Sequence, residues 1–424
     1  MEPRELLLGS FRAALAAADP LQIVGHHLPS PPRGRTVVIG AGKAAAAMAS
    51  AVEAHWPAGA PLEGLVITRY GHGMPTRRIR VVEAGHPVPD EAGQAAAREI
   101  LAAATSLGPD DLLLALISGG GSALLAMPVE TVSMADLKAV TRALLASGAP
   151  IQDMNTVRKH LSAIQGGQLA AATKARVLAL VISDVTGDDP THIASGPCAA
   201  DPTTYADAVE ILERFGVEPP ASIRAPLQQG VRGQIPETPK PQAAVFERVE
   251  NRVIATAHQS LLAAATYFQG NGVSPMVLGD SVTGESSEVA KPFGALAREI
   301  RRHGHPAKPP VALISGGETT VTLRGKGRGG RCTEFLLSLA IDLAGLDRTW
   351  ALACDTDGID GSEDNAGAVL APDALERARA LGLEPKKMLA GNDGYGFFSA
   401  LGDLVVTGPT RTNVNDYRVI LVTA

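Results

Sequence analysis

A chain of 424 residues is longer than one hydrophobic core usually supports, so we expect two domains, or three. Hydrophobic residues make up 45% and charged residues 19% of the chain, which excludes a disordered or fibrous protein. The formal net charge of −6 provides no basic surface for nucleic acid or an anionic membrane, so neither is an expected partner.

Cysteine usage and the N-terminal sequence predict a cytoplasmic protein. The three cysteines, Cys198, Cys332 and Cys354, are widely spaced and form no C-x-x-C pair, which argues against a disulfide framework or a structural zinc site. The first residues are acidic where a signal peptide would be basic. No stretch reaches the roughly 18 apolar residues that a membrane-spanning helix needs.

Short apolar runs alternate with alanine-rich stretches along most of the chain. Strands are expected, in chain order, at Thr36–Ile39, Leu65–Thr68, Ile79–Glu83, Leu112–Ile117, Val177–Ile182, Arg252–Thr256, Pro275–Leu278, Val311–Ile314, Thr349–Cys354, Leu404–Thr407 and Arg418–Val422. Helices are expected at Lys43–Ala54, Ala92–Thr105, Met134–Ser147, Leu261–Gly270, Glu285–Arg302 and Phe335–Ala344. This alternation predicts an α/β fold with largely parallel sheets and helices on both faces.

A proline-rich stretch between Gly216 and Ala243 has little apolar periodicity, as expected of a crossing between domains. We therefore expect an N-terminal domain of residues 1–240 and a C-terminal domain of residues 241–424. The string Leu116-Ile-Ser-Gly-Gly-Gly-Ser-Ala also resembles Leu313-Ile-Ser-Gly-Gly-Glu-Thr-Thr. Common ancestry and two ordinary strand-to-helix turns explain this likeness equally well, and either way each half has a glycine-rich loop after a strand.

The first such loop, Gly40-Ala-Gly-Lys-Ala-Ala, partly matches a dinucleotide-binding fingerprint. The expected acidic residue after the next strand is absent, although Arg69 there could meet the 2′-phosphate of NADP. A lysine in the first helical turn opposes the helix macrodipole, so Lys43 is expected to face an anion. The alternative is a solvated surface lysine.

The next two loops suggest an anion nest and a metal site. Glycines and hydroxyls that can form an amide nest follow a buried strand at Ser118, Gly119, Gly120, Gly121 and Ser122. Carboxylates suited to Mg²⁺ follow another strand at Asp184, Asp188 and Asp189. The alternatives are a tight turn and an acidic turn with local caps.

In the second half, Gly325-Lys-Gly-Arg-Gly-Gly-Arg places three cations just before a helix, which suits a polyphosphate. A mobile basic loop is the alternative. Asp355-Thr-Asp-Gly-Ile-Asp partly looks like a calcium loop but lacks its spacing and its terminal Glu. Thr407–Asp416 is rich in amide and hydroxyl groups that serve turns or ligands equally well.

Together these strings resemble the glycerate 2-kinase family, which has an N-terminal glycerate-kinase domain and a C-terminal MOFRL domain. The resemblance runs in family order from about residue 35 to 420. It rests on Val38-Ile-Gly-Ala-Gly-Lys-Ala, Ala84-Gly-His-Pro-Val-Pro-Asp, Leu116-Ile-Ser-Gly-Gly-Gly-Ser-Ala, Val157-Arg-Lys-His-Leu-Ser, Ile182-Ser-Asp-Val, Gly187-Asp-Asp-Pro, Ala194-Ser-Gly-Pro, Ile314-Ser-Gly-Gly-Glu-Thr, Gly327-Arg-Gly-Gly-Arg, Asp355-Thr-Asp-Gly-Ile-Asp-Gly and Thr412-Asn-Val-Asn-Asp.

The resemblance implies an enzyme that transfers phosphate from ATP to the 2-hydroxyl of D-glycerate, with Mg²⁺ or another divalent cation. It also implies a fold of two Rossmann-like α/β domains with the site in an interdomain cleft. It places the catalytic roles on Lys43 and Arg331. Binding of substrate and nucleotide is expected at Ser118, Gly119, Gly120, Gly121, Ser122, Ser315, Gly316, Gly317, Glu318, Asn413 and Asn415, with Asp184, Asp188 and Asp189 as candidate metal ligands. The chain departs from the family pattern at Gln165, Thr186, Cys332 and Arg411, which leaves fine substrate contacts and nucleotide preference open. The oligomeric state is open too, with a homodimer as one option.

Two other functions compete with the kinase. The dinucleotide-like loop and Arg69 allow an NADP-dependent hydroxypyruvate reductase, a label that members of the family have carried. A non-catalytic sensor of phosphorylated metabolites would bind ligand without turnover. Carboxylate clusters and a cationic glycine loop favour the kinase over both.

Overall fold

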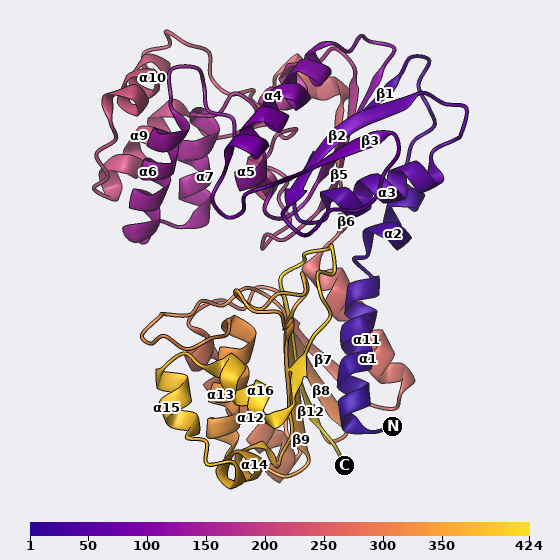
Figure 1. Cartoon of the computed structure of the whole chain (residues 1–424), viewed down its shortest axis with the longest axis vertical. Coiled ribbons are helices and arrows are strands. Elements are labelled where there is room, and N and C mark those ends of the chain that lie inside the picture. The colour runs from indigo at the N-terminus through magenta and orange to yellow at the C-terminus, as the bar shows by residue number, and fades with distance from the viewer. The chain divides into compact units, whose positions relative to one another are not determined.

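The computed structural model describes residues 1–424 and divides the chain into two compact units. One unit, called the N-terminal unit below, contains Pro20–Ile254, and the other, the C-terminal unit, contains Met1–Asp19 together with Ala255–Ala424 (Figure 1). The expected boundary after residue 240 therefore differs from the division in the structure. The proline-rich stretch is not the crossing, because β6 (Val249–Ala255) follows it and completes the first sheet.

The N-terminal unit is built on a six-stranded sheet in the order β3-β2-β1-β4-β5-β6. The pairings of β1 with β2 and β4, of β2 with β3, and of β4 with β5 are all parallel, as expected. Every residue of β1 and β4 is buried, which matches their uninterrupted apolar sequences. Besides β6, the strands of this sheet are β1 (Thr36–Ala41), β2 (Leu62–Arg69), β3 (Ile79–Ala84), β4 (Leu112–Ile117) and β5 (Arg176–Ile182).

A helical cluster forms a second core within the N-terminal unit (Figure 1). It consists of α6 (Met134–Ala146), α7 (Ile151–His160), α9 (Tyr205–Arg214) and α10 (Ala221–Val231), which bury Leu144, Val157 and Ile211 among others. The remaining helices of the unit are α2 (Pro20–Ile23), η1 (Val24–His27), α3 (Ala45–His55), α4 (Glu91–Thr105), α5 (Gly121–Leu124), α8 (Gln168–Ala171), η2 (Ile193–Ser195) and η3 (Ala244–Arg248).

The sheet of the C-terminal unit has the order β11-β10-β9-β12-β8-β7 and is not largely parallel. Only β7 and β8 pair in parallel, whereas β12 is antiparallel to both β8 and β9, and β10 is antiparallel to β9 and β11. The expectation of a second parallel sheet is therefore wrong. The last strand of the chain inserts between β8 and β9 and runs opposite to both, and apolar composition does not reveal strand direction. The strands are β7 (Ser274–Gly279), β8 (Val311–Ser315), β9 (Thr349–Asp355), β10 (Gly367–Leu370), β11 (Leu404–Val405) and β12 (Asp416–Val422).

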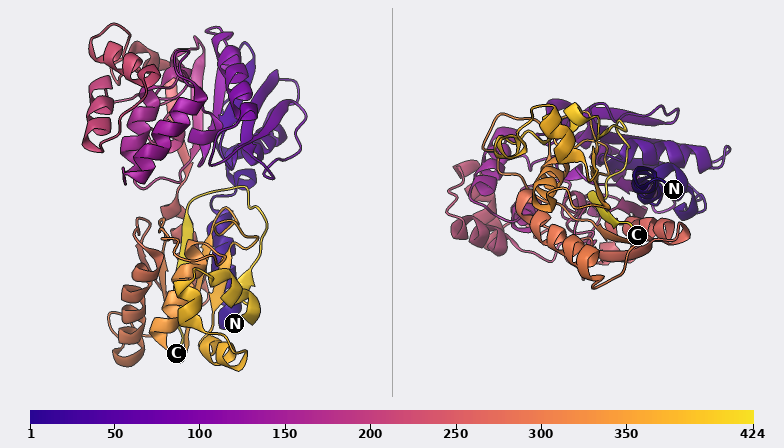
Figure 2. Two further views of the ribbon diagram at one scale, coloured as in Figure 1. Left: turned by 60° about the vertical axis from the view of Figure 1, so that its left-hand side comes forward. Right: turned by 90° about the horizontal axis from the view of Figure 1, so that it is seen from below.

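The first helix of the chain, α1 (Pro3–Ala16), belongs to the C-terminal unit. Its buried residues Leu7, Phe11 and Ala14 share a core with α11 (Ala257–Gly270) and with β12. Both views of Figure 2 show this indigo helix beside the orange and yellow segments of the same unit. The other helices here are α12 (Ser286–His303), α13 (Arg331–Leu343), α14 (Ala374–Ala380), α15 (Pro385–Ala390) and α16 (Gly394–Leu401).

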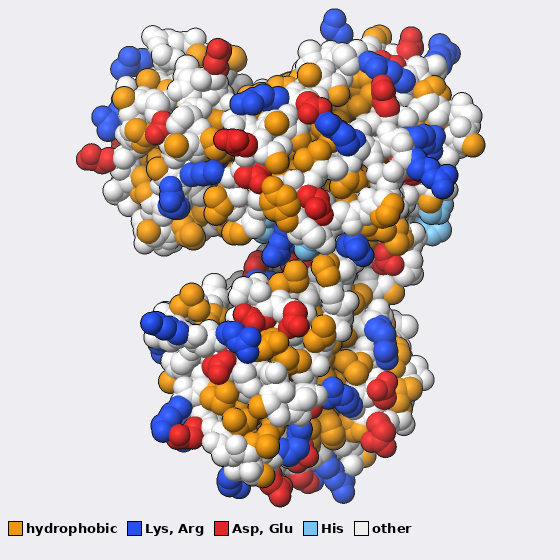
Figure 3. All heavy atoms as spheres, in the orientation of Figure 1, with side chains coloured by type: hydrophobic (Ala, Val, Ile, Leu, Met, Phe, Trp, Pro, Cys, Tyr) orange, Lys and Arg blue, Asp and Glu red, His pale blue; other side chains and the backbone are white.

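All eleven expected strands exist, but the sequence reading missed β10, Gly367–Leu370. This strand has only four residues, and its apolar letters run straight into Ala371-Pro372, so no periodicity distinguishes it. The expected helices also exist. On the face drawn in Figure 3, Lys and Arg side chains of each unit are interspersed with Asp and Glu, in keeping with the small negative net charge.

Candidate active site

The N-terminal edge is the name used here for the loops that follow β1, β4 and β5. Register aligns Ala41 at the end of β1 with Ile117 at the end of β4, and Ile117 with Val181 near the end of β5. Because the strands are parallel, their carboxyl ends open at one edge of the sheet, where ligands bind in open α/β sheets. The fold therefore brings the Lys43, Ser118 and Asp184 loops to one place.

The loop after β1 is held by its own hydrogen bonds. The Gly42 N–H donates to the Ile67 carbonyl at 3.1 Å, and the Lys43 N–H donates to the Gly119 carbonyl at 2.8 Å. The Ala44 N–H donates to Ser118 Oγ at 3.0 Å. These backbone donors are thus committed within the protein, and a dinucleotide pyrophosphate would find none of them free.

Lys43 lies just before α3, which starts at Ala45, and not in its first turn as expected. The macrodipole argument for an anion beside Lys43 is therefore weaker than the sequence suggested. A Cβ added at Gly120 would lie 3.5 Å from Lys43 Cγ and 3.0 Å from His86 Nε2. The Lys43 side chain thus reaches the glycine loop after β4.

The loop from Ser118 to Ser122 has the features of an anion nest. Gly120 has a φ of 82°, and the N–H groups of Gly119 and Gly120 donate to no group of the chain. Gly121 packs so tightly that an added Cβ would lie 2.5 Å from the Ala194 Cβ. Two unused neighbouring amides near a lysine can bind a phosphate or a carboxylate.

A cavity of about 280 Å³ opens beside this nest. Of the expected site residues with side chains, it contains Ser122 and Asp184. Five polar residues that the sequence did not point to also line it: His86, Gln152, Asn155, Arg158 and His192. The full lining is His86, Pro87, Gly120, Ser122, Ala123, Ile151, Gln152, Asn155, Arg158, Asp184, Val185, His192 and Ala194. The sequence offered one signal for Arg158, because the string Val157-Arg-Lys-His-Leu-Ser is part of the family resemblance. Nothing in that string indicates that Arg158 lies near the glycine loop.

Two of the cavity's polar residues have pKa values lowered by burial. Burial, followed by the charge of Lys159, lowers the pKa of His192, so this imidazole is neutral at pH 7. Burial also lowers the pKa of Arg158, since removal from water makes the charged form of the side chain less favourable. Arginine nevertheless stays charged at any physiological pH.

Gln165, one of the departures from the family pattern, supports this wall of the cavity. Its Nε2 donates to the Ser122 carbonyl at 2.9 Å and to the Leu125 carbonyl at 3.3 Å. Ser122 Oγ in turn lies 2.8 Å from Ser195 Oγ. Gln165 therefore holds the end of the glycine loop by backbone contacts and carries no charge into the cavity.

The three candidate metal ligands do not converge. Asp184 lines the cavity, but Asp189 Oδ1 accepts from the Thr191 N–H at 2.8 Å, and Asp188 adopts a φ of 55° in the same turn. No group of three or more His, Cys, Asp or Glu side chains in the chain is arranged to hold a metal ion. Asp189 thus caps its own turn, which was the alternative to a metal site. Of the three carboxylates, Asp184 alone is placed to contribute an oxygen ligand.

The C-terminal edge is the name used here for the end of β8, the end of β9, the start of β12 and the start of α13. Register pairs Ser315 with Arg418 and Asp355 with Asp416. Because β12 runs antiparallel to its neighbours, its first residues lie at the same edge as the last residues of β8 and β9. The inserted strand therefore brings the segment from Asn413 to Asp416 to the Ser315 loop.

Arg331 stands at the centre of this edge, bound to three carboxylates. Its Nε lies 2.7 Å from Asp416 Oδ1, its Nη2 2.7 Å from Asp355 Oδ2, and its Nη1 2.8 Å from Glu318 Oε1. Burial alone would lower the pKa of Arg331, but these carboxylates raise it well above its ordinary value. Arg331 is therefore a fixed cation within an acidic setting, rather than part of a mobile loop.

A second arginine holds the same acidic group in place. Arg418 Nη2 lies 2.6 Å from Asp416 Oδ2, and Arg418 Nη1 donates to the Gly316 carbonyl at 3.0 Å. Asp416 thus bridges two guanidinium groups, and both its side chain and that of Arg418 are buried. This arrangement links the Ser315 loop, β12 and α13 into one rigid edge.

The structure places the remaining predicted residues of this half at the same edge. Ser315 Oγ is buried without a hydrogen-bond partner, and the Gly316 N–H donates to the Gly279 carbonyl at 2.8 Å. Gly317 has a φ of 101° and its carbonyl accepts from the Asp416 N–H at 3.1 Å. Asn415 has a φ of 65° and its carbonyl accepts from Thr356 Oγ1 at 2.6 Å. Asn413 is buried beside it.

The segment from Asp355 to Asp360 is a helix cap and not a calcium loop. Asp360 Oδ1 accepts from the Cys332 N–H at 3.0 Å, and its Oδ2 accepts from the Thr333 N–H at 2.9 Å. A carboxylate that binds the first N–H groups of α13 stabilises the start of the helix. Asp360 therefore fixes the position of Arg331, the first residue of α13.

The cationic loop before α13 is anchored. Asn392 Oδ1 accepts from the N–H groups of Arg324 and Gly325 at 2.7 and 3.0 Å. The Arg328 guanidinium lies 4.5 Å from the centre of the Tyr395 ring. The segment around Asn392 is thus the support of this loop.

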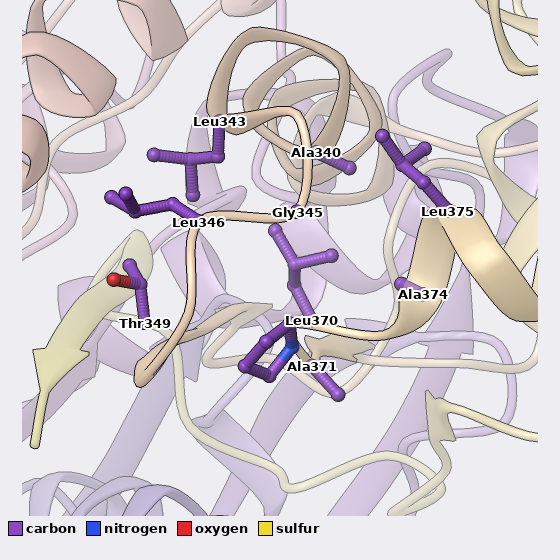
Figure 4. Close-up of a pocket in the computed structure, with 10 residues that line it drawn as sticks. Ala340, Leu343, Gly345, Leu346, Thr349, Leu370, Ala371, Ala374 and Leu375 are labelled. Atoms are coloured by element: carbon purple, nitrogen blue, oxygen red, sulfur yellow. The ribbon is translucent and has the colours of Figure 1, made fainter.

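A further small hollow of about 10 Å³ lies among α13, β10 and α14 (Figure 4). Figure 4 shows Leu343, Leu346, Leu370 and Leu375 around it, with Thr349 as its one hydroxyl. It contains no titratable group, so it is a packing gap and not a site for chemistry. No helix of the structure combines the length and apolar character that crossing a bilayer requires.

Comparisons with known proteins agree on one family. Residues 6–228 match the family described as a domain of unknown function, DUF4147, and residues 311–416 match the MOFRL family. The chain is 38% identical to the glycerate 2-kinase of Pyrococcus horikoshii over 100% of this chain and 98% of that one. It is 37% identical to the D-glycerate 2-kinase of Thermotoga maritima over 99% of this chain and 98% of that one. Two Agrobacterium vitis proteins, 53% and 52% identical over 99% and 92% of this chain and 94% and 100% of theirs, carry the provisional name hydroxypyruvate reductase.

Solved structures give the same result. A crystal structure of glycerate kinase from Thermotoga maritima superposes with a TM-score of 0.88 at 36% identity, covering 99% of both chains. A crystal structure of a Pyrococcus horikoshii protein superposes with a TM-score of 0.83 at 38% identity, covering 100% of this chain and 99% of that one. With both family matches in order along the chain and relatives aligned over its full length, the chain belongs to the glycerate 2-kinase family.

Proposed function

We propose that this protein is an ATP-dependent kinase that phosphorylates D-glycerate at its 2-hydroxyl, giving 2-phosphoglycerate and ADP. The observation that carries the proposal is the similarity over the whole chain to proteins named glycerate 2-kinase in two organisms. The aligned length spans the segments that form the nest of the N-terminal edge and the arginine pair of the C-terminal edge.

The side chains of both edges suit phosphoryl transfer, which depends on positioning and charge neutralisation more than on covalent chemistry. Lys43 and the unused N–H groups of Gly119 and Gly120 supply positive potential for an anionic group. Arg331 supplies a guanidinium whose orientation is fixed by three carboxylates. We assign the catalytic roles to Lys43 and Arg331, and ligand binding to the Ser118–Ser122 and Ser315–Glu318 loops with Asn413 and Asn415.

The carboxylates suit Mg²⁺ to a limited extent. Mg²⁺ usually takes one or two protein carboxylates and completes its shell with water and substrate phosphates. Asp184 on the cavity wall fits that requirement, whereas the bond from Thr191 keeps Asp189 within its turn. Bound Mg²⁺ would neutralise charge on the ATP phosphates, and the proposed role of Asp184 is to hold it.

The alternative is an NADP-dependent hydroxypyruvate reductase, the provisional name of the two Agrobacterium vitis relatives. A reductase of this kind would bind the dinucleotide pyrophosphate on the N–H groups of the first glycine loop. The N–H groups of Gly42, Lys43 and Ala44 already donate hydrogen bonds within the protein. Because they are not available to a pyrophosphate, the kinase is favoured over the reductase.

One pair of assays separates the two activities. ADP release from ATP, Mg²⁺ and D-glycerate is expected, with 2-phosphoglycerate as the product by NMR. NADPH oxidation in the presence of hydroxypyruvate is expected to stay at the background rate. Reductase activity without ATP consumption would contradict the proposal, and 3-phosphoglycerate as the product would contradict the 2-hydroxyl as the acceptor.

A kinase of this class acts on small molecules, and we place it in the cytoplasm, where ATP is available. It needs no nucleic acid or membrane. A homodimer stays a prediction that light scattering of the purified protein can check.

A further inference from the structure

Arg158 is a cation without a counter-ion on the wall of the cavity in the N-terminal unit. It is half-buried, lines the cavity and forms no ion pair with any carboxylate of the chain. The one hydrogen bond of its side chain is donated from Nη1 to Asn155 Oδ1 at 3.2 Å, a neutral partner. A partly desolvated charge that is left without an opposite charge is unfavourable, and a bound anion removes that penalty.

A chain of polar contacts fixes Arg158 relative to the glycine loop. Asn155 is buried one helical turn before Arg158 on α7, and its Oδ1 also accepts from Ser195 Oγ at 3.3 Å. Ser195 Oγ lies 2.8 Å from Ser122 Oγ, and Ser122 ends the nest. The guanidinium is thus held at a set position on the wall of the cavity that Gly120 also lines, and a specific anion site needs this rigidity.

The size of the cavity indicates which anion binds there. Pockets for drug-sized ligands have volumes of about 300–1,000 Å³, and this cavity of about 280 Å³ lies just below that range. It suits a three-carbon hydroxy acid better than a nucleotide. A guanidinium binds a carboxylate through two parallel N–H···O bonds, which a lysine cannot do.

We propose that Arg158 binds the carboxylate of D-glycerate and so selects an acid over a neutral polyol. Asn155, Ser195 and Ser122 act as positioning residues for it. This inference rests on the proposed kinase function and assigns one part of the substrate to a residue that sequence reasoning overlooked.

The test compares two substrates in two proteins. D-glyceramide has the hydroxyls of D-glycerate but a neutral amide in place of the carboxylate. In Arg158→Met, KM for D-glycerate is expected to rise about 10- to 100-fold, since a charge-assisted bidentate pair is lost. KM for ATP should stay constant, and the preference in kcat/KM for D-glycerate over D-glyceramide should fall by a similar factor.

Two controls keep the result interpretable. Arg142→Met on α6 removes an exposed arginine of the same helical cluster, whose Nε bonds only to the Lys138 carbonyl at 3.3 Å, and should change neither KM. If circular dichroism shows that Arg158→Met does not fold, Arg158→Lys replaces it. A smaller loss of preference is then expected, because lysine keeps the charge but lacks the planar fork.

The outcomes are distinct. A rise in KM for ATP with an unchanged KM for D-glycerate would overturn the inference and place Arg158 on the nucleotide. An unchanged preference for the acid would overturn it as well. Should the wild-type chain lack kinase activity, the proposed function fails by itself, and calorimetric binding of D-glycerate to wild type and Arg158→Met then decides whether Arg158 binds the acid.

Discussion

At the scale of single residues, Glu334 shows how burial in the C-terminal unit changes a common side chain. Glu334 is 5% exposed, and Asn392 Nδ2 donates to its Oε1 at a long 3.5 Å. Burial, followed by the charge of Glu285, raises the pKa of Glu334 from 4.5 to about 7. In the unfolded chain the same carboxyl group has its ordinary pKa of 4.5. Between pH 4.5 and about pH 7, the folded protein therefore binds more protons at this group than the unfolded chain does.

This difference predicts a pH-dependent stability. The raised pKa means that the contribution of Glu334 is fully present below pH 4.5 and is lost as pH rises to about 7. Glu334→Gln mimics the protonated form, so it should match wild type at about pH 4 and exceed its free energy of unfolding at pH 8 by up to about 3 kcal/mol. Urea unfolding of wild type and Glu334→Gln at the two pH values measures these free energies. A stability difference between the two proteins that is the same at both pH values would contradict the prediction.

At the scale of elements, the first helix shows a packing choice that local sequence leaves undecided. Leu6, Leu7 and Phe11 give α1 one apolar face, which any core could bury. In the structure this face packs in the C-terminal unit, where Phe11 stacks near Tyr417 with ring centres 5.9 Å apart. Tyr417 also donates to Ser10 Oγ at 2.8 Å. The N-terminal residues are therefore part of the core around the last strand.

Replacing Phe11 by Ala should destabilise the C-terminal unit by about 3–5 kcal/mol, because a fully buried ring leaves a cavity. The matched control is Arg12→Ala, which removes a neighbouring exposed side chain 3.6 Å from Glu5 and should cost no more than about 0.5 kcal/mol. Urea unfolding followed by circular dichroism measures both. Equal effects of the two substitutions would show that α1 is not needed in this core.

At the scale of the whole molecule, we expect one reaction to depend on both units. Lys43 belongs to the N-terminal unit and Arg331 to the C-terminal unit, and each stands at the edge of its sheet where the predicted site residues gather. Arg331 also balances Asp355, Asp416 and Glu318, so its removal leaves carboxylates unpaired as well as removing a cation. Substitution by Lys keeps the charge and is the milder test.

Lys43→Ala and Arg331→Lys should each lower kcat for D-glycerate phosphorylation by about 100-fold or more, since the proposed role of each is to neutralise charge that develops during transfer. The double variant should lose less than the product of the two effects, as groups acting on one transition state do. The control is Lys174→Ala, an exposed lysine just before β5 and so at the opposite edge of that sheet. Near-normal turnover in both single variants would refute the catalytic roles.

Much of the fold was predictable because its strands are local patterns. Fully buried runs such as Leu112–Ile117 contain only apolar residues, and glycine and serine directly after them indicate loops at strand ends. The Ser118–Ser122 and Ser315–Glu318 loops were found in this way. The short strand Gly367–Leu370 and the direction of β12 were not, because four apolar residues fit several structures and pairing direction leaves no mark on composition.

The sequence by itself determined the α/β class, the family and the loops that carry the candidate site, because each of these depends on residues close together along the chain. Only the tertiary structure decided that α1 joins the last strand, that three carboxylates hold Arg331, and that Arg158 from α7 lies beside the glycine loop after β4. These are contacts between segments far apart in sequence. Their energies come from burial and charge in the folded state, which no local pattern encodes.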